Sequence, residues 1–224
     1  MRDSLNLFQS TVGTVARLFH RIGALAHPEF HPRTMPLPPP DCARTPSHQR
    51  TIAVRAYART DGLWDIEGHL TDAWPEPIPT AGRVLPAGEP MHAMWLRLTV
   101  DRTATIVAAQ AVTDAGPYGP ACAAIAPDYS QLVGVRVARG YRDAIRRLFG
   151  RTAGCTHMNE LAGVMGSAML QAMWNVLTED PDQKPFSIDG CHALKASSPQ
   201  VAQFFPRWYK AEDGTQNTPE TEGG

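Results

Sequence analysis

The sequence has little of several features that mark large classes of proteins. Only 19% of its 224 residues are charged, and 21 lysines and arginines against 22 aspartates and glutamates leave a formal net charge of −1. This balance argues against non-specific electrostatic binding of nucleic acid, which needs clustered positive charge. Four cysteines are too few for a disulfide scaffold. No apolar run approaches the roughly 20 residues of a membrane-spanning helix, and the start MRDSLNLFQS does not read as a secretory signal. We therefore predict a cytoplasmic protein that binds neither nucleic acid nor membranes.

Four common functional motifs are also absent. The chain has no Walker loop, no GxGxxG after a strand, no GxSxG elbow and no HExxH. These absences argue against a nucleotide-binding fold, an α/β-hydrolase and a zincin. What is present is enough apolar material, 43% of the residues, for one packed domain with tails.

The first part of the chain predicts a helix and a linker. Apolar residues recur at three- and four-residue steps over residues 4–26, at Leu5, Phe8, Val12, Val15, Phe19 and Ile22. This spacing predicts an amphipathic helix that docks on its own domain or on a neighbouring subunit, so a homodimer through this helix is expected. A proline-rich linker follows to residue 49, and residues 210–224 are polar and predicted to be disordered.

Residues 50–209 predict a single α+β domain. Alternating, β-branched runs indicate strands over 51–58, 63–72, 91–100 and 104–112, and Asp61-Gly62 marks a turn. From residue 126 the spacing becomes helical, most clearly from Cys155 to Leu177. Strands first and helices second predict an antiparallel sheet of about four or more strands packed against a C-terminal group of helices.

The stretch LWDIEGHLTD places ionisable groups on one side of a strand. Trp64, Ile66, Gly68 and Leu70 share one face, and Asp65, Glu67 and His69 share the other. The apolar set suits a core. If solvent covers the other face the polar row is ordinary, but if helices cover it the three groups must be paired, metal-bound or shifted in pKa.

The stretch GCTHMNEL, residues 154–161, predicts chemistry at the start of a helix. His157 and Glu160 are three residues apart and so share a helix face. They could ligate one metal, or form an acid–base pair in which the carboxylate orients the imidazole. A purely structural alternative is that Thr156 caps the helix with help from Glu160. Cys155 beside a helix N-terminus is expected to have a lowered thiol pKa.

A second Cys-His pair, Cys191-His192, widens the set of candidate metal ligands. With Cys155 and His157 it supplies the donors of a tetrahedral zinc site, although the spacings are not those of zinc knuckles. An open catalytic site is the alternative, with His69, His157 and His192 as ligands. Zinc and iron suit such donors equally. The histidines of the N-terminal region have no predicted role; they are His20, His27, His31 and His48.

Other polar residues are candidates for substrate contacts. Tyr118 could donate a proton, and Arg142 could receive a substrate carboxylate, although a solvated helix face is the favoured explanation of Arg142. His92 and Asp114 complete the candidate substrate-binding set.

Together these motifs resemble a bacterial family built on a domain of unknown function. The resemblance rests on the WDIEGHLTD strand, the GCTHxxEL helix start and the CHAL segment, and covers roughly residues 36–209. It implies an accessory role in bacterial aromatic-acid or acyl catabolism. We expect an enzyme, a lyase rather than a hydrolase, that acts on a small aromatic or phenylpropanoid-type molecule. Its catalytic residues would be His157, Glu160, Glu67, His69 and Tyr118, aided by bound zinc or iron or by no cofactor.

Two other hypotheses remain open from the sequence. The protein could be a non-catalytic scaffold in which a closed site of Cys155, His157, Cys191 and His192 holds a structural metal. Alternatively, these polar groups could simply satisfy one another inside a core.

Overall fold

A computed structural model describes residues 37–211 of the protein. The amphipathic helix predicted over residues 4–26 lies outside the described residues, and so does the predicted tail from residue 212 onward. The chain divides between Thr45 and Pro46, and the second of the two units carries all the structure discussed below.

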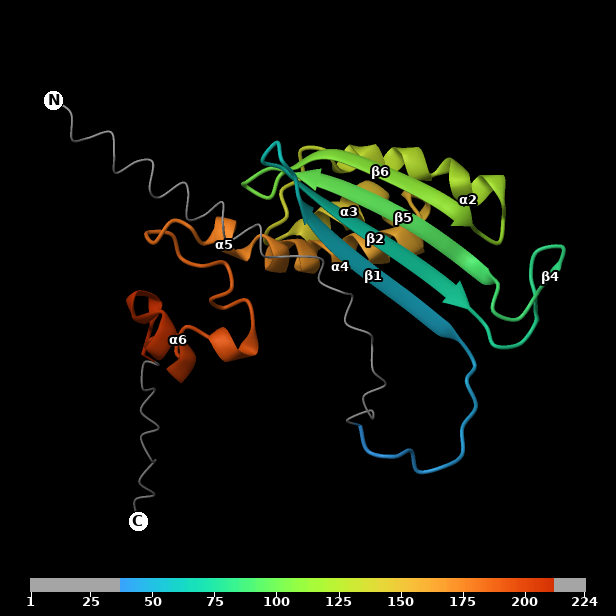
Figure 1. Ribbon diagram of the computed structural model, residues 1–224, viewed down its shortest axis with the longest axis horizontal. Helices are drawn as coiled ribbons and strands as arrows, with labels where there is room; N and C mark the ends of the chain where they lie inside the picture. The colour runs from blue at the N-terminus through green and yellow to red at the C-terminus, as the bar shows by residue number, and fades with distance from the viewer. Residues whose placement is uncertain (1–36, 212–224) are drawn as a thin grey trace, which may run out of the picture. The chain divides into compact units, whose positions relative to one another are not determined.

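Four long strands form one antiparallel sheet in the order β1-β2-β5-β6 (Figure 1). They are β1 (Gln49–Ala58), β2 (Trp64–Ala73), β5 (Pro90–Val100) and β6 (Ile106–Ala115). Each overlaps a strand predicted from alternation of residue type. The predicted turn between β1 and β2 contains Gly62, whose φ of +83° is a conformation that glycine adopts without strain.

The segment between β2 and β5 contains a short strand pair. Strands β3 (Ile78–Pro79) and β4 (Val84–Leu85) pair with each other in a separate two-stranded ladder. This hairpin projects beyond the end of the sheet at which β2 finishes and β5 begins (Figure 1).

The helices follow the sheet in the chain, as expected. They are α2 (Pro120–Ala124), α3 (Tyr141–Phe149), α4 (Thr156–Ala172), α5 (Trp174–Leu177) and α6 (Pro199–Phe204), with 3₁₀ turns at Ala126–Leu132 (η1), Arg151–Ala153 (η2), His192–Leu194 (η3) and Pro206–Trp208 (η4). The long helix predicted to Leu177 is interrupted at Met173, where φ −96° and ψ 9° leave the helical region. The α+β architecture predicted from the sequence is therefore confirmed.

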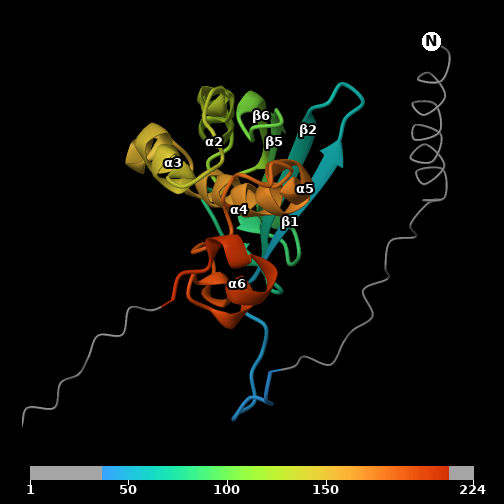
Figure 2. The same cartoon turned by 90° about the vertical axis from the view of Figure 1, so that its left-hand side faces the viewer.

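Helix α4 packs against the inward face of the sheet, as a view from the side shows (Figure 2). Ile66 and Leu70 of β2 are fully buried, together with Leu161 and Met165 of α4. At Gly68 the helix comes so close that an added Cβ would lie 2.5 Å from the Met165 sulfur. Glycine thus permits the contact between helix and sheet that forms the centre of the core.

A smaller hydrophobic cluster lies in the C-terminal segment. Ile188, Ala196 and Val201 are buried in it, with Leu194, Phe205 and Trp208 packed around them. In Figure 1 this segment lies beyond the end of the sheet opposite to the β3–β4 hairpin. Within residues 37–211, no helix has the length and apolar character that a membrane crossing requires.

Candidate functional site

Three polar residues lie side by side at one end of the inward sheet face. The register pairs Arg50 of β1 with Asp72 of β2, and Asp72 with His92 of β5. Asp72 continues the buried row of Ile66, Gly68 and Leu70, because alternate residues of a strand share a face. A register shift follows between Asp72 and Ala73, which ends regular pairing beside the site.

The Asp72 carboxylate organises this end of the sheet. Only 1% of the residue is exposed. Arg50 donates from Nε to Oδ1 and from Nη2 to Oδ2, each at 2.8 Å. His48 Nε2 lies 3.0 Å from Oδ1, and His92 Nδ1 lies 3.1 Å from Oδ2. The bidentate arginine fixes both the charge and the orientation of the carboxylate.

The first turn of α4 supplies two further side chains. His157 stacks on His92, with ring centroids 3.7 Å apart and 28° between the planes, and its Nε2 lies 3.7 Å from Asp72 Oδ2. Glu160 forms an ion pair with Arg50. We call His48, Arg50, Asp72, His92, His157 and Glu160 the Asp72 cluster.

Tyr129 fixes the start of α4. Its buried hydroxyl lies 2.6 Å from Asn159 Oδ1 and 3.1 Å from the carbonyl oxygen and the amide nitrogen of Cys155. Cys155 occupies the N-cap position and makes no side-chain cap. The structural alternative for GCTHMNEL required Thr156 to cap the helix with help from Glu160. Thr156 is instead the first residue of α4, and Glu160 contacts Arg50 of β1.

Burial and charge set the protonation of the cluster. Burial alone would raise the pKa of Asp72, but the Arg50 hydrogen bonds and charge outweigh it and hold that pKa below its ordinary value. Burial lowers the pKa of His92, the charge of His157 lowers it further, and Asp72 opposes both. Burial also lowers the pKa of His157 against the effect of Asp72. These directions favour an ionised Asp72 and neutral His92 and His157 at neutral pH.

The hydrogen-bond pattern also assigns the tautomer of His92. An ionised carboxylate only accepts hydrogen bonds, so the ring nitrogen that faces it must carry the proton. In a neutral His92 the proton is therefore on Nδ1, and Nε2 keeps a free lone pair. This arrangement of carboxylate, imidazole and free nitrogen is that of a general base.

The structure brings only some of the predicted site residues together. His157, Glu160 and His92 belong to the Asp72 cluster, and the Cys155 sulfur lies 3.8 Å from His157 Nδ1. The sequence predicts that Glu160 orients His157. In the structure Glu160 pairs with Arg50 instead, and the carboxylate beside His157 is Asp72.

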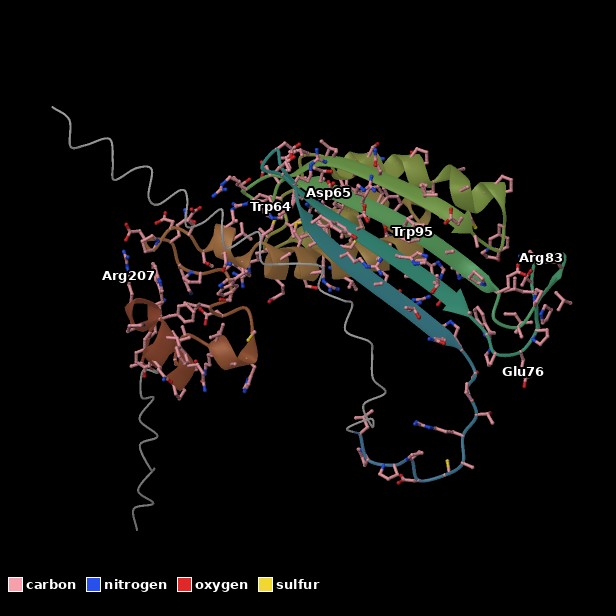
Figure 3. All side chains as sticks on the ribbon, in the orientation of Figure 1. Trp64, Asp65, Glu76, Arg83, Trp95 and Arg207 are labelled. Atoms are coloured by element: carbon pink, nitrogen blue, oxygen red, sulfur yellow. The ribbon has the colours of Figure 1, made fainter. Side chains whose placement is uncertain are left out.

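Glu67, His69 and Asp114 lie on the outward face of the sheet, away from α4. Glu67 pairs with Arg97 at 2.6 Å. His69 stacks on Trp95 at 3.7 Å, and the Trp95 indole donates to Asp114 at 2.9 Å; Trp95 and Asp65 are labelled on the sheet in Figure 3. His69 therefore cannot share a ligand or a substrate with His157, because the sheet separates the two side chains.

The remaining predicted residues lie elsewhere. Tyr118 is 69% exposed in the turn before α2. Arg142 is exposed on α3. Cys191 and His192 are exposed at the start of η3, so they do not form the closed metal site predicted with Cys155 and His157.

In residues 37–211 one group of three side chains could hold a metal: Asp72, His92 and His157, whose donor atoms lie within 4.8 Å of one another. The sequence predicts only His157 of these as a ligand. It assigns no role to His48, Arg50 or Asp72, although the even-numbered row of β2 runs from Ile66 to Asp72 and could have indicated an inward carboxylate.

Comparison with known proteins gives a family and nothing further. Neither the curated proteins nor the solved structures contain a match to this chain. A family model described as "Protein of unknown function (DUF2889)" matches residues 48–171. This stretch begins at His48 and ends one residue before the end of α4, so it contains the whole Asp72 cluster. The matched stretch is shorter than the range of roughly residues 36–209 that the sequence motifs predicted, and the CHAL segment lies outside it. The chain belongs to the DUF2889 family.

Proposed function

We propose that this protein is an enzyme that moves a proton on a small organic molecule, with the Asp72 cluster as its active site. The proposal is carried by one observation: the buried Asp72 carboxylate faces Nδ1 of His92 at 3.1 Å, which leaves the opposite ring nitrogen, Nε2, for a substrate proton. The reaction would be a lysis, with hydrolysis as the alternative. The substrate would be of aromatic or phenylpropanoid type, and this substrate class rests on the resemblance of the sequence motifs alone.

In this proposal His92 is the general base. Asp72 accepts the Nδ1 proton and stabilises the imidazolium that forms when Nε2 takes a proton from the substrate. Such a group contributes about 10²- to 10⁴-fold to a rate. Asp72 remains ionised throughout because Arg50 holds its charge.

His157 is the neutral imidazole stacked on the base. Burial lowers the pKa of His92 most, and the charge of the stacked His157 lowers it further, so protonation of one ring disfavours protonation of the other. Because both imidazoles are neutral before the reaction, the proton that His92 takes from the substrate would be returned by the resulting imidazolium to the leaving group or product, and His92 would end neutral again. His157 is 24% exposed and His92 is 12% exposed, so both can be reached from solvent.

A metal-assisted reaction is the second candidate, favoured by the convergence of Asp72, His92 and His157. Two histidines and one carboxylate suit iron or zinc, and the metal would supply an electrophile for a substrate oxygen. The present side-chain positions do not fit it. Nitrogen lone pairs lie in the ring planes, and two nearly parallel rings 3.7 Å apart do not direct them to one point. A rotation of one imidazole would be required.

Elemental analysis of the untagged protein tests the second candidate. A finding of about one equivalent of zinc or iron that is lost in the His157→Ala variant would favour metal-assisted catalysis over acid–base catalysis. We expect no stoichiometric metal.

Solvent-deuterium incorporation tests the first candidate. Aromatic and phenylpropanoid acids would be incubated with the protein in deuterated buffer and followed by mass spectrometry for product or deuterium. We expect a reaction that is lost in His92→Gln and retained in His69→Gln, which removes an imidazole from the opposite face of the sheet. A reaction that survives His92→Gln would refute the role of the Asp72 cluster.

The homodimer through residues 4–26 and a cytoplasmic location stay predictions. Light scattering of the full chain, compared with a chain that starts at residue 46, tests the first of them.

A further inference from the structure

A cavity lies about 20 Å from the Asp72 cluster, measured as the rise along α4 from His157 to Leu170. Its volume is about 620 Å³, within the range of small-molecule pockets. One wall is formed by the turn between β5 and β6 and by the segment that precedes α3, and the other by residues 183–190 of the C-terminal segment. It therefore lies at the end of the sheet away from the β3–β4 hairpin, near α5 (Figure 1).

The floor of this cavity is apolar and held in place. Leu170 and Leu177 contribute from the end of α4 and from α5. Phe186 contributes from the facing segment and packs edge-on against Trp174, with ring centroids 5.2 Å apart. Ile188 is 5% exposed and anchors the same segment in the C-terminal hydrophobic cluster. These residues offer a ring-sized surface for an apolar body.

The rim of the cavity is cationic. Arg136, Arg139 and Lys184 line it with one carboxylate, Asp189, so three positive charges against one negative leave a formal excess of two. Lys184 pairs with Asp189 at 2.7 Å, and Arg136 donates to the Thr103 carbonyl at 3.0 Å. Within residues 37–211, Arg139 has no hydrogen-bond or ion-pair partner. An unpaired guanidinium in the lining of a cavity that also contains apolar side chains presents a fork that matches a carboxylate.

We propose that this cavity binds a small organic anion with an apolar ring, such as an aromatic carboxylate, as a site separate from the Asp72 cluster. The ring packs against Leu177 and Phe186, and the carboxylate pairs with Arg139. Residues 177–190 lie beyond the stretch that matches the family, whereas Arg136 and Arg139 lie within it. The inference does not depend on the proposed catalytic function.

Binding of 2-naphthoate to the full-length protein tests the proposal, with two probes as controls. The neutral 2-naphthylmethanol keeps the ring and lacks the charge, and acetate keeps the charge and lacks the ring. We expect saturable binding of 2-naphthoate in calorimetry with a dissociation constant below about 1 mM, and at least about tenfold weaker binding of both controls. Methyl NMR signals of Leu177 and Ile188 should shift with the same dissociation constant.

Two charge-matched variants locate the site. Arg139→Gln should weaken 2-naphthoate binding about tenfold, the effect of one lost charge-assisted hydrogen bond. Arg147→Gln removes an exposed cation of α3 that does not line the cavity and should leave binding unchanged. Thermal melts of both variants confirm folding.

Three results would overturn the assignment. The first is the absence of saturable binding, which would identify the cavity as a solvent-filled gap between the main core and the C-terminal hydrophobic cluster. The second is equal binding of 2-naphthylmethanol or an equal effect of the two arginine variants. The third is a shift of imidazole signals of His92 and His157 in place of the Leu177 and Ile188 methyl signals, which would place the anion at the Asp72 cluster.

Discussion

Replacement of Asp72 by asparagine is the sharpest test of the idea that one buried carboxylate organises the site. The asparagine side chain has nearly the same shape, but it carries no charge and its amide nitrogen would face donors. In the native protein Asp72 accepts two hydrogen bonds from Arg50 and one each from His48 and His92. The Asp72→Asn change leaves these donors without an ionised partner.

The expected cost follows from burial. Removal of one partner of a buried ion pair typically costs roughly 3–5 kcal/mol, because the other charge remains unpaired. The Arg50 side chain is 31% exposed and keeps its ion pair with Glu160, so water and Glu160 replace part of what it loses. We therefore expect the lower end, a decrease of about 3 kcal/mol in the free energy of unfolding.

Urea unfolding of the full chain measures this decrease, with Asp114→Asn as the matched control. Asp114 lies on the outward face of the sheet and accepts one hydrogen bond from the Trp95 indole, so its replacement should cost about 1 kcal/mol or less. The reasoning is refuted if both variants lose the same stability with unchanged denaturant slopes.

Three further variants test other parts of the structure. Gly68→Ala should lower the free energy of unfolding by about 1–3 kcal/mol, because its Cβ would lie 2.5 Å from the Met165 sulfur; a thermal melt like that of the native protein would contradict the close approach. Burial lowers the pKa of His69 below its ordinary value of 6.5, although the charge of Asp114 opposes this shift. The unfolded chain therefore binds a proton at His69 more tightly than the folded protein does. The free energy of unfolding should consequently fall as the pH drops below 6.5. Melting temperatures between about pH 8 and 5 should vary less in His69→Gln, and identical profiles would count against this origin. Tyr129→Phe should cost about 1–3 kcal/mol and speed amide exchange in the first turn of α4, whereas unchanged exchange there would show that another contact holds the turn.

Residue patterns predict the elements of this fold well, because alternation and helical spacing report burial directly. The inward row of Ile66, Gly68 and Leu70 follows from them, and so do the helix beginning near Cys155 and the antiparallel sheet. What alternation cannot supply is the register between strands.

The candidate site depends on that missing information. Arg50, Asp72 and His92 are 20 or more residues apart in pairs, and only the strand register places them side by side. Asp72 is hard to recognise from the sequence because a carboxylate at the end of an apolar row looks like the end of a strand. His48 follows a proline-rich segment, which gives no sign of a role, yet it reaches the same carboxylate.

The same register has a consequence for how this chain can change in evolution. One residue inserted or deleted within β1, β2 or β5 would turn Arg50, Asp72 or His92 toward the opposite face and dismantle the cluster. The segment between Trp74 and Glu89 carries no member of the cluster. Its strands β3 and β4 pair only with each other, so this hairpin is separate from the ladder of the four-stranded sheet. Insertions and deletions among relatives should therefore accumulate between these two residues and be rare in β1, β2 and β5.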